Sequence, residues 1–200
     1  MEAIIKRNDE KKLFEFFDKF SENQLSKYER LYKNLHPYLK NDINIITISN
    51  SDTIRNIFLK IHSEFKINSV FVSESRPQFE GREIAKFFSE NNINTHIVLE
   101  AAIPRYINQS DICLIGADKI LSNGNVINKV GSNLLALNCK YFNIPFLVLA
   151  DSSKFSDETI FNEKKKSVSE IWAEAPKNII IDNFYFEEIN KELITKLISD

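Results

Sequence analysis

The sequence predicts an α/β fold, namely a Rossmann-like, doubly wound parallel sheet with a short helical N-terminal arm. From residue 43 onward, short apolar runs alternate with segments of helical periodicity, which is typical of parallel βαβ units. The apolar runs are continuous, as expected of strands covered on both faces. A length of 200 residues with 43% hydrophobic content fits one domain with a well-developed core.

The arm is expected to span residues 1–42 and the main domain residues 43–200. Two interpretations fit the many apolar and aromatic side chains of the arm: packing into the core, or docking onto the main domain or a second subunit. Pro37 closes the arm. Its apolar residues recur at helical spacing: Leu13, Phe14, Phe16, Phe17 and Phe20, then Leu25, Tyr28, Leu31, Tyr32 and Leu35.

The main domain contains six apolar runs that we expect to be strands, at residues 43–48, 70–72, 95–99, 112–115, 146–150 and 179–181. Helices are expected at about 52–65, 81–91, 101–108 and 129–142, with a last one near 186–198.

Composition excludes several classes of function. A net charge of -2 argues against direct binding to nucleic acid, which favours a basic surface. Cys113 and Cys139 belong to no CxxC pair or Cys/His cluster, so we expect no metal site, and no cofactor is expected either. No apolar run approaches the roughly 20 residues that span a bilayer, and the N-terminus lacks a signal-peptide pattern. We therefore expect a cytoplasmic protein without a membrane partner.

Polar residues follow the first expected strand. The segment Ser49-Asn50-Ser51-Asp52-Thr53 leads into a helical pattern. Hydroxyls and backbone amides at a helix start can bind an anion. The same residue types are also preferred helix caps, so an ordinary N-cap is an equally good interpretation.

Other strand ends carry groups of the same kind. Glu74 and Arg76 follow the second strand, and either Arg76 binds an anion or the two form a surface ion pair. Gly116 and Asp118 follow the fourth strand, and Asn128-Lys129 is expected to open a helix. The fifth strand is followed by Lys154. Because carboxyl ends of parallel strands meet at one edge of the sheet, these groups predict a site for a phosphorylated small molecule.

The motifs resemble those of one superfamily. They comprise Glu74-Ser75-Arg76-Pro77 with Gly81, Gly116-Ala117-Asp118, Asn123-Gly124, Asn128-Lys129 with Gly131, Ile144-Pro145-Phe146 and Lys154-Phe155. The superfamily contains the alpha, beta and delta subunits of initiation factor 2B, methylthioribose-1-phosphate isomerase and archaeal ribose-1,5-bisphosphate isomerase. The resemblance covers about residues 43–198. It implies a domain that binds a phosphorylated sugar or nucleotide at the strand ends, and dimerisation through that domain.

Two departures separate the chain from the isomerases of this superfamily. Ser49 stands where the isomerases carry a cysteine, which works with the carboxylate matching Asp118. A serine hydroxyl is far less acidic than a thiol. The isomerases also have a longer N-terminal domain with an Arg-Gly-Ala-type segment for phosphate. Glu80 before Gly81 looks more like the factor-2B branch.

Three hypotheses follow from the resemblance. The first is a non-catalytic, factor-2B-like protein of archaeal type that keeps the phosphometabolite pocket as a sensor or assembly site. The second is an aldose-ketose isomerase for a phosphorylated pentose, with Asp118 and Ser49 or a water moving protons. The third is a structural partner of a longer paralogue. We expect a homodimer or higher oligomer, formed by the helix near Asn128 and the segment after Lys154, with the N-terminal arm as a second candidate.

Overall fold

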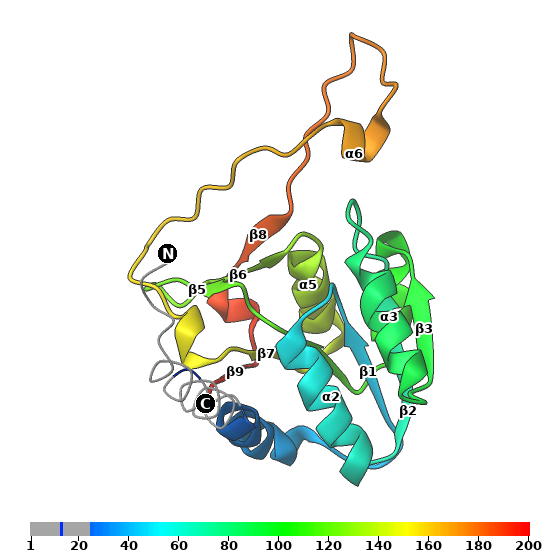
Figure 1. The fold of residues 1–200 in the computed structure, drawn as a ribbon, viewed down its shortest axis with the longest axis vertical. Helices are drawn as coiled ribbons and strands as arrows, with labels where there is room; N and C mark the ends of the chain where they lie inside the picture. The colour runs from blue at the N-terminus through cyan, green and yellow to red at the C-terminus, as the bar shows by residue number, and fades with distance from the viewer. Residues whose placement is uncertain (1–12, 14–24) are drawn as a thin grey trace.

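The computed structural model describes Leu13 and residues 25–200, and a six-stranded sheet forms its centre (Figure 1). The strand order is β3-β2-β1-β4-β7-β9, and every neighbouring pair is parallel. The order runs outward in both directions from β1 and β4, which is the doubly wound arrangement that the sequence predicts. The strands are β1 (Ile43–Thr47), β2 (Ile67–Ser73), β3 (Thr95–Val98), β4 (Ile112–Ile115), β7 (Phe146–Leu149) and β9 (Lys196–Ile198).

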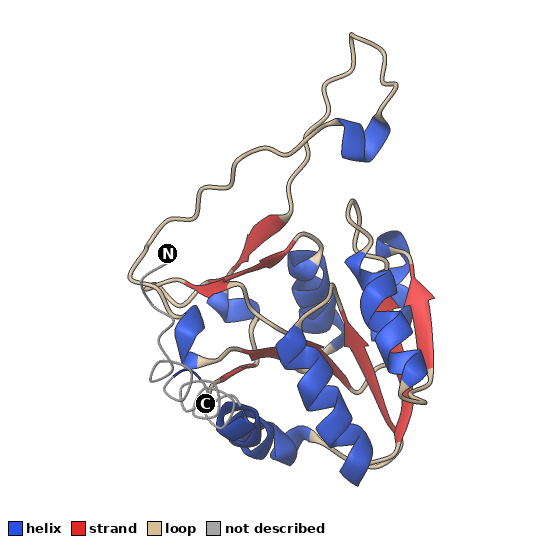
Figure 2. Cartoon of the chain, in the orientation of Figure 1, coloured by secondary structure: helices blue, strands red, loops and turns tan. Residues whose placement is uncertain are grey.

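Helices cover both faces of this sheet (Figure 2). Helices α2 (Asp52–Glu64) and α3 (Glu80–Glu90) pack on one face, and α4 (Ile103–Ile107) and α5 (Ser132–Phe142) pack on the other. Successive strand residues point to opposite faces, so Ile45 of β1 joins the first core and its neighbour Ile46 joins the second. The continuous apolar runs of the sequence follow from this double covering.

The described part of the arm packs against the main domain. Residues 25–35 are helical, and η1 (His36–Tyr38) follows them. Leu31 and Leu35 are fully buried in the same core as α2 and β1. This agrees with the core-packing interpretation of residues 25–35. The arm phenylalanines at positions 14, 16, 17 and 20 lie outside the described residues.

A second, antiparallel sheet lies beside the first, in the order β5-β6-β8. Its strands are β5 (Lys119–Ile120), β6 (Val126–Lys129) and β8 (Phe186–Ile189). Two sequence predictions were wrong here. Asn128 and Lys129 end strand β6, because 126–129 pairs with strands on both sides, and the helix begins only at Ser132. The expected helix near 186–198 is instead β8, the 3₁₀ turn η4 (Lys191–Leu193) and β9.

Residues 156–185 project from the body and return to it as β8, with the short helix α6 (Ser169–Trp172) at the outer end (Figure 1). We call this segment the projection. The strand expected at 179–181 is absent from it, since these residues pair with no other strand. The projection exposes apolar side chains, which include Ile160, Val168, Ile171, Trp172, Ile179 and Ile180.

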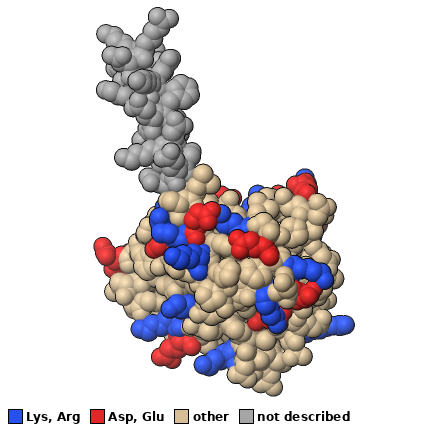
Figure 3. Space-filling model, turned by 90° about the horizontal axis from the view of Figure 1, so that it is seen from below, with Lys and Arg blue, Asp and Glu red and all other residues tan. Residues whose placement is uncertain are grey.

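Basic and acidic side chains are interspersed over the face opposite the projection (Figure 3). Within the described residues, each helix is too short or too polar to traverse a bilayer.

The remaining short elements are the 3₁₀ turns η2 (Glu100–Ala102) and η3 (Ser152–Lys154).

Candidate functional site

A cavity of about 440 Å³ opens where the strand order reverses, at the carboxyl ends of β1 and β4. Ligands of doubly wound sheets bind at this switch point because the adjacent loops diverge there. Loops that follow β1, β4, β6 and β7 all reach the cavity. The structure brings eight of the ten predicted site residues to its wall: Ser49, Asn50, Ser51, Gly116, Asp118, Asn128, Lys129 and Lys154.

The first turn of α2 forms one wall of the cavity. Ser51 is the N-cap, and its Oγ accepts a hydrogen bond from the amide of Ile54 at 3.4 Å. The capping interpretation is therefore correct, yet the amides of Asp52 and Thr53 still lack an acceptor within the helix. Gly116 permits this arrangement, because a Cβ there would lie 2.8 Å from Ser51 Oγ. This wall can therefore donate hydrogen bonds from two backbone amides to an anion, and it carries the positive end of the dipole of a 13-residue helix.

Ser49 is held in an unusual backbone conformation. Its φ is 63°, and that of Ser75 is 64°, which is the left-handed region that side chains disfavour. The amide of Ser49 donates to Ser75 Oγ at 2.8 Å, and the amide of Ser75 donates to Glu100 Oε1 at 2.5 Å. These bonds fix the turn after β1, so Ser49 is half-buried at the cavity wall.

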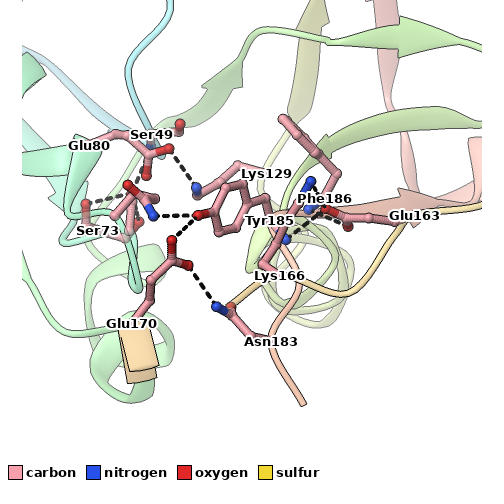
Figure 4. Close-up of polar contacts among 12 residues, drawn as sticks. Ser49, Ser73, Glu80, Lys129, Glu163, Lys166, Glu170, Asn183, Tyr185 and Phe186 are labelled. Carbon is pink, nitrogen blue, oxygen red and sulfur yellow. Dashed lines mark hydrogen bonds and ion pairs between the residues drawn. The ribbon is translucent and has the colours of Figure 1, made fainter. Parts of the chain in front are cut away.

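Lys129, itself buried, forms an ion pair with the partly exposed Glu80 at another part of the wall (Figure 4). Its side chain is 3% exposed, and Nζ lies 2.5 Å from Glu80 Oε1 and 4.9 Å from the ring centre of Tyr185. The second oxygen of Glu80, Oε2, is buried and has no hydrogen-bond partner among the described residues. The positive charge of Lys129 is therefore already compensated, and an incoming anion would compete with Glu80.

Asn128 does not start a helix, which corrects the reason given for its place in the site. Its Nδ2 donates to Ser132 Oγ at 2.8 Å, and the side chain is buried. The first amides of α5 are also engaged, because those of Gly131 and Asn133 donate to Glu187 Oε1 at 2.8 and 2.7 Å. Asn128 thus fixes the turn into α5, and Glu187 occupies the helix end that was expected to bind an anion.

Asp118 and Lys154 line the cavity and form no ion pair within 4.0 Å among the described residues. Burial raises the pKa of the Asp118 carboxyl, the charges of Lys154 and Lys129 act in the opposite direction, and the net pKa lies above the ordinary value. Lys154 has no ion-pair partner among the described residues within 4.0 Å. The cavity therefore offers one free ammonium group beside a carboxylate that gains protons more easily than an exposed one.

Glu74 and Arg76 do not line this cavity. Glu74 pairs with Arg82 rather than with Arg76, so the ion pair considered for the sequence is also absent. The exposed Arg76 lies 5.1 Å from the ring centre of Phe79. It lines a separate hollow of about 380 Å³ between the body and the projection, together with Pro77, Val130, Ile171, Asp182, Asn183 and Phe184.

The cavity wall also includes residues that the sequence predictions did not name as site residues. Lys27 and Tyr28 come from the helical arm, and Lys27 lies 3.5 Å from Asp151. Nothing in their helical spacing distinguishes them from other surface positions. Asp151 and Ser153, in contrast, belong to the polar run after β7, which was a recognisable signal. In the described part of the chain, no cluster of three or more His, Cys, Asp or Glu side chains is placed to hold a metal ion.

Fold and site together define an α/β protein with an anion-competent cavity at the switch point of a parallel sheet. The chain belongs to the Initiation factor 2 subunit family, whose model matches residues 4–200. It is 34% identical over 125 residues to the ribose 1,5-bisphosphate isomerase of Archaeoglobus fulgidus, covering 62% of this chain and 40% of the relative. It is 27% identical over 206 residues to the isomerase of the same name from Methanocaldococcus jannaschii, covering 100% of this chain and 67% of the relative.

Other relatives carry the initiation-factor name. The alpha subunit of translation initiation factor eIF2B from Dictyostelium discoideum is 27% identical, over 82% of this chain and 55% of its own length. The crystal structure of eIF-2B from Pyrococcus horikoshii OT3 superposes with a TM-score of 0.77 at 25% identity, covering 90% of this chain and 64% of the other. The family thus includes initiation-factor subunits and sugar-phosphate isomerases, and this chain spans between 40% and 67% of the lengths of these four proteins.

Proposed function

We propose that the protein binds a phosphorylated sugar or nucleotide in the switch-point cavity and uses it as a regulatory or assembly signal rather than as a substrate. The observation that carries this proposal is the unpaired Lys154 on the same cavity as the first amides of α2. A phosphate group would accept hydrogen bonds from both, because its oxygens suit backbone amides and an ammonium group.

The non-catalytic role is supported by Ser49. This hydroxyl stands at the strand end where the resembling isomerases carry a thiol, and Ser49 lines the cavity, with its backbone amide bonded to Ser75 Oγ. A serine hydroxyl donates its proton far less readily than a thiol near neutral pH. Binding without turnover is the function that such a wall supports best.

Thermal unfolding tests the binding. A ligand that binds the native state raises the melting temperature by mass action. We expect ribose 5-phosphate or AMP to raise it, and Lys154→Ala to abolish the rise. Lys86→Ala, an exposed lysine on α3 outside the cavity, is the matched control and should leave the rise unchanged. A rise that survives in Lys154→Ala would place the phosphate elsewhere.

An isomerase acting on a phosphorylated pentose is the second candidate, and Asp118 favours it. A carboxyl group with a raised pKa can take up and release protons near neutral pH more easily than an ordinary one. Asp118 would move the proton between the two sugar carbons, with Ser49 or a water as its partner. The similarity to the two ribose 1,5-bisphosphate isomerases supports this alternative.

We also propose that the protein forms a homodimer, and that it can assemble with a longer paralogue. The exposed apolar side chains of the projection support this, because a large exposed apolar surface is typical of an interface. Helix α5 adds Leu134, Leu137 and Tyr141, which are exposed at spacings that place them on one side of the helix.

A further inference from the structure

The charges around the cavity limit the kind of phosphorylated ligand that it accepts. Its wall carries the ammonium groups of Lys27, Lys129 and Lys154. It also carries the carboxyl groups of Asp52, Glu80, Asp118 and Asp151. Acidic groups therefore outnumber basic groups, although a phosphate ester brings close to two further negative charges at neutral pH. A ligand with several phosphates needs more free positive charge than this wall offers.

Two of the three lysines are already paired within the protein. Lys129 contacts Glu80 at 2.5 Å, and Lys27 contacts Asp151 at 3.5 Å. In the first pair the Lys129 side chain is 3% exposed and the Glu80 side chain 31% exposed, so the lysine charge is held inside the protein while Glu80 keeps one side open to the cavity. Of the three, only Lys154 has no ion-pair partner among the described residues, and it lines the same cavity as the start of α2.

The Glu80 side of the cavity suits a hydrogen-bond donor instead. Glu80 Oε2 is buried without a partner, and a buried acceptor left unsatisfied is costly. A sugar hydroxyl would satisfy it by donating its proton. A phosphate at the same place has no proton to donate when fully ionised and would meet a like charge, which is unfavourable.

We propose that Glu80 is a specificity-determining residue that selects ligands with one phosphate group and a hydroxyl-bearing sugar, and rejects sugar bisphosphates. The phosphate lies by Lys154 and α2, and the hydroxyls face Glu80. Asp118 lines the same cavity as Glu80, Lys129 and Lys154. This inference rests on the proposed function, because it concerns the same cavity.

Calorimetric titration with ribose 5-phosphate and ribose 1,5-bisphosphate tests the selection. The wild-type protein should bind the monophosphate at least roughly tenfold more tightly, which is the effect of a modest unfavourable charge contact. Glu80→Gln frees Lys129 and removes the negative charge, so it should bring the affinity for the bisphosphate up to or beyond that for the monophosphate. Glu74→Gln is the matched control, because it makes the same change of charge at a position outside the cavity, and it should keep the wild-type preference.

Each outcome decides between the two proposals. Equal or tighter binding of the bisphosphate by the wild-type protein overturns the role of Glu80 and leaves the phosphate site in place, and this comparison needs no variant to fold. An unchanged preference in a folded Glu80→Gln variant overturns it as well. Failure of the wild-type protein to bind either sugar phosphate overturns the selection, and failure to bind AMP as well overturns the proposed function itself.

Discussion

The α carbon of Gly81 lies so close to Ser73 that a Cβ built on it would be 1.8 Å from the Ser73 carbonyl oxygen. This contact joins the first turn of α3 to the end of β2. Because Glu80 precedes Gly81 on that turn, the same contact fixes the position of Glu80 at the cavity.

Gly81→Ala should therefore destabilise the protein, since backbone atoms must move to admit the methyl group. We expect a loss of about 3 kcal/mol in the free energy of unfolding, measured by urea denaturation. Lys86→Ala, on the exposed side of the same helix, is the control and should change it by less than about 0.5 kcal/mol. Equal stability of Gly81→Ala and the wild type would contradict the close contact.

The second prediction concerns pH and the attachment of the helical arm. Asp200 accepts hydrogen bonds from Arg30 at 3.0 Å and from the amide of Ser152 at 2.7 Å. Burial acts to raise the pKa of Asp200, but these bonds outweigh it, and the net pKa lies below the ordinary 3.8. A carboxyl with a lowered folded-state pKa stabilises the fold above its unfolded pKa, and the contribution is lost as the pH falls through the folded pKa.

Asp200→Asn should accordingly destabilise the protein by about 1 kcal/mol at neutral pH, the size typical of a partly exposed ion pair. The difference from the wild type should shrink as the pH falls below 4. Denaturation at neutral and acidic pH measures both values. A difference that stays constant with pH would show that the carboxylate charge is not involved.

The strands of the large sheet could be predicted from sequence because they are covered on both faces. Runs such as Ile112–Ile115 are apolar throughout, and a buried parallel strand has no polar side to interrupt the pattern. The glycines and polar residues after these strands likewise located most of the cavity, since the edge of a parallel sheet brings distant loops together.

The C-terminal region could not be predicted in the same way. Phe186, Ile189, Leu193 and Leu197 are spaced as on a helix, yet they belong to two strands and a turn. Their pairing with β6 and β7 involves residues about 50 to 60 positions away, which local periodicity does not encode. The ion pair of Lys129 with Glu80 also joins distant segments, so the sequence could not show that this predicted ligand-binding lysine has a counter-ion within the protein.

The third prediction is that isomerase activity is absent or very low. Ser49 cannot readily replace a thiol as the proton-donating partner of Asp118. Incubation with ribose 1,5-bisphosphate or methylthioribose 1-phosphate, followed by product analysis, measures the activity. Turnover that is robust in the wild type and lost in Asp118→Asn would establish the isomerase instead, because that variant keeps the shape of the side chain and removes its proton chemistry.

The last prediction is a homodimer in solution that forms through the projection and α5. Ile180 is 88% exposed and Tyr141 is 79% exposed, and apolar side chains this open to water are stabilised when a second copy covers them. A closed two-fold dimer is the commonest oligomer, and in it each copy covers the same surface of the other copy. Light scattering during size-exclusion chromatography should give twice the chain mass of 23.3 kDa.

Ile180→Glu combined with Leu137→Glu should shift the protein to the monomer mass, because both substitutions bury a charge in the dimer. Leu59→Glu is the matched control, since Leu59 is an exposed leucine on α2, away from the projection and α5. It should leave the dimer intact. A single peak at 23.3 kDa for the wild type across a wide dilution range would contradict the dimer, and a dimer that persists in the double variant would place the interface on another surface.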